Sequence, residues 1–186
     1  MNLPSQILEN YKKLLNCGLD GLAKNPDWPQ VVEKLVSARE RAANIFLAGN
    51  GGSAANANHL ATDLIYGANA KGKGALRVHS LSSNSSVLTC LGNDTGYENV
   101  FAKQLEALAR PGDLLLLFSG SGNSPNILRA LEAARRLRVH SVSFLGFDGG
   151  KAKALSDLAL HFPIDDMQVV EDLHMIVGHM LLKHLL

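Results

Sequence analysis

A short apolar run, a glycine-rich turn and an alanine-rich segment follow one another in residues 44–63. Residues 45–48 predict a buried strand, residues 49–52 break it, and Ser53 is a favourable N-cap for a helix. A strand that leads through glycines into a helix directs free backbone N–H groups and the positive end of the helix dipole to one place. The segment therefore predicts an α/β unit that can hold a phosphate, although an ordinary tight turn would use the same glycines.

The rest of the chain repeats this alternation of strands and helices. Apolar runs predict strands at residues 45–48, 75–81, 113–118, 140–145 and 158–161. Helical patterns predict helices at residues 53–66, 86–91, 97–109, 124–137, 151–154 and 168–186. Strands that alternate with helices indicate an α/β fold with a central parallel sheet covered on both faces, and the unbroken apolar run 114–118 suits a strand in its centre.

Two more helices are predicted ahead of this unit. Residues 3–24 and 29–42 carry apolar side chains at helical spacing but no cluster of reactive groups. Their apolar sides are expected to pack as a partner surface. We expect a single domain over residues 1–186, in which residues 1–43 are oligomerisation helices and residues 44–186 form the ligand-binding core.

The composition argues against several classes of protein. With 186 residues and a formal net charge of +1, the chain lacks the basic excess that is typical of nucleic-acid binding. Cys17 and Cys90 are far apart and without CxxC spacing, so we expect reduced thiols in a cytoplasmic protein. Residues 1–6 do not resemble a signal peptide, and the apolar stretches are short of a membrane span. We therefore expect neither nucleic-acid nor membrane partners.

Nucleotide-binding motifs are weak or missing. Residues 49–54 formally fit a G-x-G-x-x-A dinucleotide fingerprint, but the acidic residue expected after the next strand is absent from residues 77–80. The sequence also lacks a P-loop and a G-x-S-x-G nucleophile elbow. We therefore expect no nucleotide cofactor.

A second loop, at residues 119–124, repeats the strand, glycine and helix-start arrangement. Ser119, Ser121 and Ser124 bring hydroxyls and glycine-freed amides to a helix that begins near Pro125. Hydroxyls and backbone amides can bind phosphate without lysine or arginine. A capped turn is the competing interpretation, but a cap at Ser124 explains only one of the three serines. We predict that a small phosphorylated molecule binds where the two loops meet at the sheet edge.

Histidines and carboxylates gather on two of the predicted helices. His59 and Asp63 are spaced i,i+4 on one face of the first helix of the core. The last helix carries five such residues: Glu171, Asp172, His174, His179 and His184. Asp172 and His179, seven residues apart, lie nearly on one line along the helix, and Glu171 lies roughly a quarter turn from His179, still within reach of a common centre. Such groups can ligate a metal or transfer protons, but they can equally be solvated polar positions. We expect His184 to be a surface residue and leave both interpretations open for His174.

Six ordered motifs together resemble the sugar isomerase (SIS) domain family, and within it the phosphoheptose (sedoheptulose 7-phosphate) isomerase subgroup. The resemblance covers nearly the whole chain. The motifs are Gly49-Asn50-Gly51-Gly52-Ser53, the pair His59 and Asp63, Gly92-Asn93-Asp94, Ser119-Gly120-Ser121-Gly122-Asn123-Ser124, Gly149-Gly150-Lys151, and Val170-Glu171-Asp172-Leu173-His174 through His179.

The resemblance implies a flavodoxin-like three-layer sandwich with a five-stranded parallel sheet and a homotetramer with sites between subunits. It implies that the phosphate is held by Ser53, Ser119, Gly120, Ser121 and Ser124. It further implies that the sugar is lined by Asn50, Gly51, Gly52, Asn93, Asp94 and Glu171. In isolation, the Asn93-Asp94 pair also fits a simple turn.

The resemblance also implies a zinc site made by His59, Asp63, Glu171 and His179, with Asp63 and His179 as the base and acid of isomerisation. Asp63 and Glu171 stand where the family has a glutamate and a glutamine. The implied reaction converts sedoheptulose 7-phosphate to D-glycero-D-manno-heptose 7-phosphate for lipopolysaccharide or capsule. The alternatives are a non-catalytic phosphosugar-binding or scaffold protein of the replication-initiator-associated type, and an isomerase of another sugar phosphate.

Overall fold

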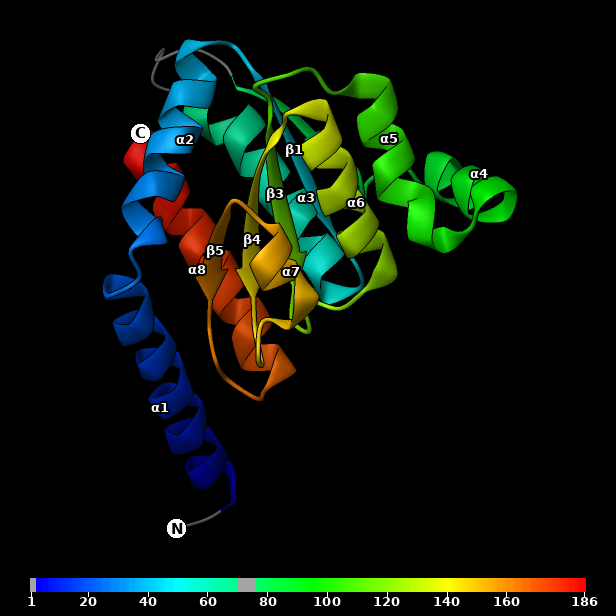
Figure 1. The fold of residues 1–186 in the computed structure, drawn as a ribbon. Helices are drawn as coiled ribbons and strands as arrows, with labels where there is room; N and C mark the ends of the chain where they lie inside the picture. Colours follow the sequence, from blue (N-terminus) through cyan, green and yellow to red (C-terminus); the bar gives the residue numbers. More distant parts are fainter. Residues whose placement is uncertain (1–2, 70–75) are drawn as a thin grey trace.

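The computed structural model describes residues 3–69 and 76–186 and has one sheet between two layers of helices (Figure 1). The strands are β1 (Asn44–Gly49), β2 (Arg77–Ser80), β3 (Leu114–Ser119), β4 (His140–Leu145) and β5 (Leu158–His161). The helices are α1 (Leu3–Ala23), α2 (Asp27–Glu40), α3 (Gly52–Ile65), α4 (Ser85–Thr95), α5 (Val100–Leu108), α6 (Pro125–Leu137), α7 (Gly150–Leu155) and α8 (Met167–Leu185), with 3₁₀ turns η1 (Gly67–Asn69) and η2 (Tyr97–Asn99). Within the described ranges, every helix is too short or too polar to span a membrane.

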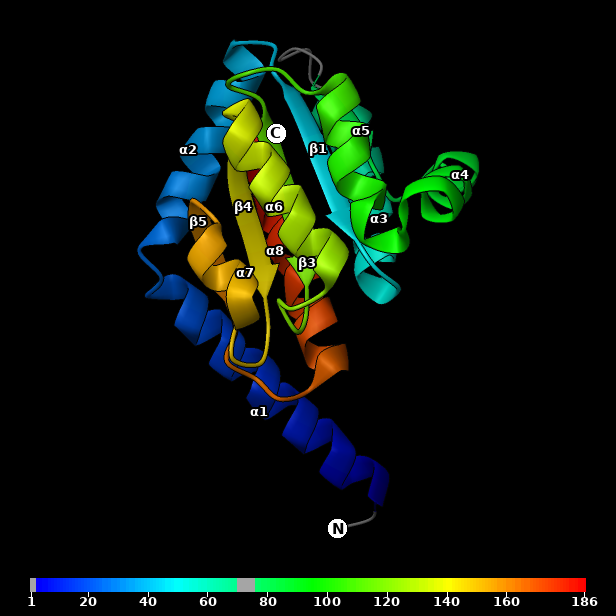
Figure 2. The same cartoon turned by 45° about the vertical axis from the view of Figure 1, so that its right-hand side comes forward.

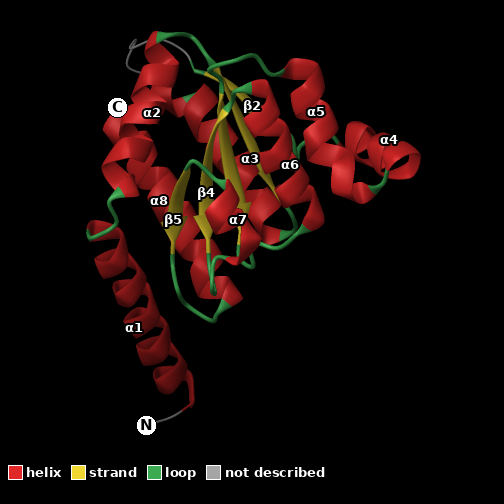
Figure 3. Ribbon diagram, in the orientation of Figure 1, coloured by secondary structure: helices red, strands yellow, loops and turns green. Residues whose placement is uncertain are grey.

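The five strands are all parallel and lie in the order β2-β1-β3-β4-β5, which confirms the predicted α/β architecture. This is the flavodoxin-like order, with the reversal of winding between β1 and β3. Figure 3 shows the sheet enclosed by helices, and the turned view in Figure 2 shows α6 and α7 on the face opposite α8.

Alternate side chains of each central strand enter two separate apolar clusters. Ile45 and Leu47 of β1 pack toward α2, α3 and α8, whereas Phe46 and Ala48 pack toward α5 and α6. All six residues of β3 are buried. Because the side chains of a strand point alternately to opposite faces, a central strand with helices on both sides must be apolar throughout.

The break between the two N-terminal helices covers the outer edge of the sheet. Asn25 Nδ2 donates to the Ala159 carbonyl (3.2 Å), and the Ala159 amide donates to Asp27 Oδ2 (2.9 Å). These side chains satisfy backbone groups of edge strand β5 that would otherwise be open to pairing with another strand. The expected start of the second helix at residue 29 is wrong, because α2 begins at Asp27. Pro29 is tolerated in the first turn, where its missing N–H has no intrahelical partner.

Several other helix boundaries also differ from the predictions. The N-cap of α3 is Gly51, at a φ of 55°, and not Ser53. Helix α4 begins at Ser85, capped by the Asn84 side chain, and runs four residues past the predicted end at 91. The strand expected at 75–81 is β2, and its first expected residue, Ala75, lies outside the described residues.

His174 is a core residue, which decides between the two interpretations that its position left open. Its ring is fully buried between Phe118, Phe144 and Phe162, with ring centroids 5.9–6.1 Å away. Neither ring nitrogen has a hydrogen-bond partner among the described residues. Burial lowers the pKa of His174 to about 3, and the nearby backbone of Leu145 opposes this shift only in part. The imidazole is therefore neutral and acts as an aromatic packing residue.

This burial predicts a pH dependence of stability. Because the pKa of His174 falls from 6.5 in the unfolded chain to about 3 in the folded one, the unfolded state binds the extra proton between these pH values. The free energy of unfolding should therefore be unaffected well above pH 6.5 and fall by about 1.4 kcal/mol per pH unit between about pH 6 and pH 3 through this group. His174→Leu should remove that slope and be at least as stable at pH 7, measured by urea unfolding. His184→Leu, the same change at an exposed position of α8, should keep the slope; equal slopes in both variants would contradict the assignment.

Candidate functional site

The two glycine-rich loops leave the sheet side by side. Gly49 at the end of β1 is in register with Phe118 of β3, so the turn at residues 50–51 and the loop at residues 119–124 start from the same edge. In a doubly wound sheet this switch point between strands is where ligands bind. The strand register therefore starts both loops at one edge of the sheet, and their convergence on one ligand stays a prediction.

The three serines of the second loop have different local roles. The Ser119 hydroxyl is nearly buried and accepts a hydrogen bond from the Gly122 amide (3.1 Å). The Ser121 hydroxyl accepts from the Asn123 amide (3.3 Å). Ser124 is the N-cap of α6 by position, but its side chain makes no capping bond. The Ser124 hydroxyl therefore stays free of the cap that was the competing interpretation of this residue.

Glycine is required where the loops approach other backbone closely. A Cβ at Gly49 would lie 2.5 Å from the Ser53 carbonyl oxygen, and Ser53 itself is buried in the first turn of α3. Gly122 has a φ of 63°, and a Cβ there would overlap the Gly149 carbonyl oxygen. Gly120 packs against the Met167 side chain at the start of α8. These contacts link the serine loop, residues 119–124, to α7 and α8.

Two histidines and an aspartate meet between α3 and α8. His59 Nε2 is 3.0 Å from His179 Nε2, and Asp63 Oδ2 lies 3.4 Å and 3.5 Å from these two nitrogens. The side chains are 53% (His59), 24% (Asp63) and 47% (His179) exposed, so one side of the cluster faces solvent.

This cluster fits a zinc ion in donor type and spacing. Imidazole nitrogen and carboxylate oxygen are common zinc ligands, and ligands of a tetrahedral ion about 2.0–2.1 Å away are roughly 3.3 Å apart. The donor atoms of His59, Asp63 and His179 all lie within 4.8 Å of one another. Three protein ligands with an exposed side match the open arrangement of a catalytic site.

Glu171, the fourth predicted ligand, lies apart from this cluster. Its carboxylate rests against the Cα of Gly52 at the start of α3, and its backbone carbonyl accepts from Asn56 Nδ2 (2.8 Å). A negative charge at this place is favoured by the positive end of the α3 dipole. The neighbouring Asp172 accepts a hydrogen bond from Tyr11 of α1 (2.6 Å) and is occupied in holding the two helices together.

Asn93 and Asp94 lie in the last turns of α4, so the alternative of a loop or turn at these residues is wrong. Asn93 Nδ2 donates to Asp94 Oδ1 (2.8 Å), and the Cys90 thiol contacts Asp94 Oδ2 (3.5 Å). This aspartate raises the pKa of the Cys90 thiol. Helix α4 projects from the body beside α5 in both ribbon views, away from the His59 cluster between α3 and α8 (Figures 1 and 2).

Two residues of the site region were missed by sequence reasoning. Asn126, in the first turn of α6, exchanges two hydrogen bonds of 2.8 Å with the Asn50 side chain. The hydroxyl of Tyr97 donates to Asn50 Oδ1 (3.1 Å). The only signal in the sequence was an amide two residues beyond Ser124, which a helix start does not require.

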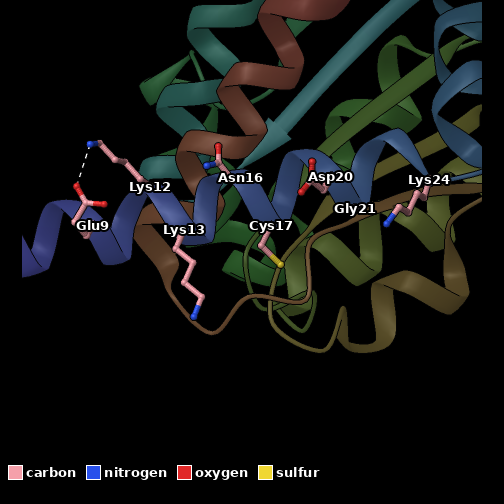
Figure 4. A pocket seen from close by; sticks show the side chains of 8 residues that line it. All are labelled: Glu9, Lys12, Lys13, Asn16, Cys17, Asp20, Gly21 and Lys24. Atoms are coloured by element: carbon pink, nitrogen blue, oxygen red, sulfur yellow. Dashed lines mark hydrogen bonds and ion pairs between the residues drawn. The ribbon is translucent and has the colours of Figure 1, made fainter.

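A hollow of about 780 Å³ along α1 is unrelated to these groups. Figure 4 shows its lining side chains, which include Glu9, Lys12, Cys17 and Lys24, spread along one stretch of chain without a common focus. Lys12 pairs with Glu9 (3.1 Å) one helical turn away. We assign this surface no chemistry.

Comparison with known proteins identifies the family of the chain. The SIS domain family model matches residues 24–146. The chain is 46% identical over 173 residues to a phosphoheptose isomerase of Helicobacter pylori (strain Shi470), which covers 92% of this chain and 88% of that protein. A structure of a phosphoheptose isomerase from Francisella tularensis superposes with a TM-score of 0.90 at 26% identity over 100% of this chain and 98% of that one. The corresponding structure from Neisseria gonorrhoeae gives 0.88 at 29% identity over 99% and 98%.

The chain therefore belongs to the SIS domain family. Its relatives further make it an enzyme of the sugar phosphate isomerase class.

The close backbone approach at Gly122 generates a stability prediction. Gly122→Ala combines an unfavourable positive φ with a clash against backbone, so it should lower the free energy of unfolding by at least about 2 kcal/mol. Gly21→Ala is the matched control, because a Cβ at this position of α1 meets nothing within 4 Å. There alanine should stabilise by about 0.5–1 kcal/mol. Urea unfolding of both variants measures the difference, and a neutral Gly122→Ala would refute the close approach.

Proposed function

We propose that the protein interconverts sedoheptulose 7-phosphate and D-glycero-D-manno-heptose 7-phosphate. The observation that carries this proposal is the grouping of His59, Asp63 and His179 between α3 and α8. Helix α3 starts at the turn at residues 50–51, and the start of α8 packs against the serine loop at residues 119–124. The relatives named phosphoheptose isomerase support the choice of a heptose. Asp63 lies eleven residues beyond Gly52 on α3, so the two ends of the site are separated by more than 10 Å along the helix, since each residue rises about 1.5 Å. That separation suits an extended sugar with its phosphate at the far end.

The phosphate would be held by the two loops. Free amides at the start of α3 and α6, with the helix dipoles behind them, favour a dianion without a lysine or arginine. We assign the phosphate to Ser53, Ser119, Gly120, Ser121 and Ser124. The sugar would be lined by Asn50, Gly51, Gly52 and Glu171. Because α4 projects from the body, its Asn93 and Asp94 would reach the sugar only from a neighbouring subunit of the proposed homotetramer.

Proton transfer falls to Asp63 and His179. In the ketose-to-aldose direction, Asp63 takes the proton from C1 and an enediol forms; the same proton is then returned to C2. His179 moves the hydroxyl proton between O1 and O2, so the sum of protons is unchanged. The 3.5 Å between Asp63 Oδ2 and His179 Nε2 brings both groups to one reacting edge of the substrate.

We further propose that His59, Asp63 and His179 would hold zinc, with Glu171, which lies beside Gly52, as the fourth ligand. When bound, zinc supplies polarisation of the substrate carbonyl. The support is the donor chemistry and the 3.0–3.5 Å spacing of the three groups.

We propose a homotetramer that works in the cytoplasm and feeds heptose into lipopolysaccharide or capsule. The support for assembly is α1, whose first half extends beyond the body of the protein and exposes Leu3, Ile7 and Leu8 by 54–70% (Figure 1). Large apolar side chains gathered on a projecting helix are typical of a surface that is covered by another subunit.

The isomerase proposal is tested with sedoheptulose 7-phosphate. Asp63→Asn should lower kcat by a factor on the order of 10²–10⁴, because it removes the base without changing the shape of the side chain. Binding of inorganic phosphate, measured by calorimetry, should change little. Asp20→Asn, at a distant position of α1, is the control. An inactive wild-type tetramer that still binds the sugar phosphate would instead favour the non-catalytic alternative. Turnover of another sugar phosphate, without turnover of sedoheptulose 7-phosphate, would replace the proposed substrate.

Zinc binding gives an independent prediction. Because His59 belongs to the cluster of donors, His59→Ala should weaken zinc affinity at least about tenfold, measured by competition with a chromophoric chelator. His184→Ala, the matched change at an exposed position of α8, should leave zinc affinity unchanged. Equal affinity in the His59 and His184 variants would remove the proposed site.

A further inference from the structure

The side chain of Asn50 is held by two other segments of the chain. Asn50 Nδ2 donates to Asn126 Oδ1 and Asn50 Oδ1 accepts from Asn126 Nδ2, both at 2.8 Å. The Tyr97 hydroxyl donates to the same Asn50 oxygen at 3.1 Å. Three segments that are distant in the sequence therefore meet at one amide: the turn after β1, the first turn of α6 and the 3₁₀ turn η2.

The hydrogen bonds of the Asn50 amide limit what it can offer a ligand. An asparagine oxygen has two lone pairs, and both are used at Asn50. Among the described residues, one N–H of its amide has no partner. Asn126 is 2% exposed, so losing its partner would leave a buried amide unsatisfied. The Asn50 side chain cannot accept a hydrogen bond from a substrate hydroxyl without breaking this network.

The network lies in the wall of a hollow at the start of α6. This hollow of about 530 Å³ is lined by Asn50, Tyr97, Ser124 and Asn126, together with Glu98 and Pro125. Its wall joins the turn after β1, at Asn50, to Ser124 at the end of the serine loop. A shift of either segment would change the distance between the sugar-facing turn and the phosphate end of the site.

We propose that Asn126 and Tyr97 are positioning residues for the isomerisation. Through Asn50 they fix the turn after β1 relative to the serine loop, so that a sugar phosphate meets both at once. This inference rests on the proposed isomerase function. Neither side chain is required to touch the reacting carbons.

The test uses Tyr97→Phe, Asn126→Ala and the double variant in the full chain. Tyr97→Phe should lower kcat with sedoheptulose 7-phosphate roughly tenfold, and Asn126→Ala by more, because small misplacements of bound groups cost large rate factors. Affinity for inorganic phosphate should change by less than about twofold, since the serine loop is intact. The double variant should be no slower than Asn126→Ala, because both residues act through one amide.

Tyr66→Phe is the matched control, since Tyr66 is 80% exposed and outside the network. The proposal is overturned if Tyr97→Phe behaves as this control does, if the two effects on kcat multiply, or if phosphate affinity falls in parallel with kcat. Amide hydrogen exchange at Ala54 and Ala55, whose N–H groups donate to the carbonyls of Asn50 and Gly51, needs no ligand and should be roughly tenfold faster in Tyr97→Phe and in Asn126→Ala. An inactive wild type would contradict the isomerase proposal. Unchanged amide hydrogen exchange in the variants would contradict the positioning role of Asn126 and Tyr97.

Discussion

The adjacency of β1 and β3 is the constraint on which the rest of the structure depends. Parallel pairing places the ends of both strands at one edge, and each strand is followed by a short glycine-rich loop and a helix. The N-termini of α3 and α6 consequently lie at the same edge of the sheet. The close approaches at Gly49 and Gly122 keep these loops tight, because any side chain there would meet backbone.

Helix α8 runs beside α3 and carries the second half of the candidate site. Its contact with α3 is close at Gly178, where a Cβ would lie 3.3 Å from Leu60. Glu171 lies beside Gly52, and His179 lies beside His59, so the two helices run in the same direction. Helix α1 supports α8 through the hydrogen bond from Tyr11 to Asp172, which raises the pKa of the tyrosine to about 12. The N-terminal helix thus contributes to the position of the site without entering it.

The strands could be predicted from the sequence because their apolar pattern depends on burial alone. The strands at residues 140–145 and 158–161 match the structure at both ends. Helix starts were harder to predict, since Gly51 caps α3 by its backbone conformation, which composition does not show. The pair His59 and Asp63 was recognisable from spacing within one helix. The meeting of Asn50 with Asn126 and Tyr97 was not, because it depends on how three segments pack after the sheet has formed.

The separation between the loops and the histidine cluster has a consequence for catalysis under the proposed function. A phosphate bound at the sheet edge lies far from the carbons that react, so its binding energy can only assist by orienting them. Orientation is effective only if the path between the two ends is rigid. That path is provided by α3, which starts after the turn at residues 50–51 and carries both His59 and Asp63. A helix with buried side chains at Ala57, Leu60 and Leu64 transmits the position of its first turn directly to the residues that would move the proton.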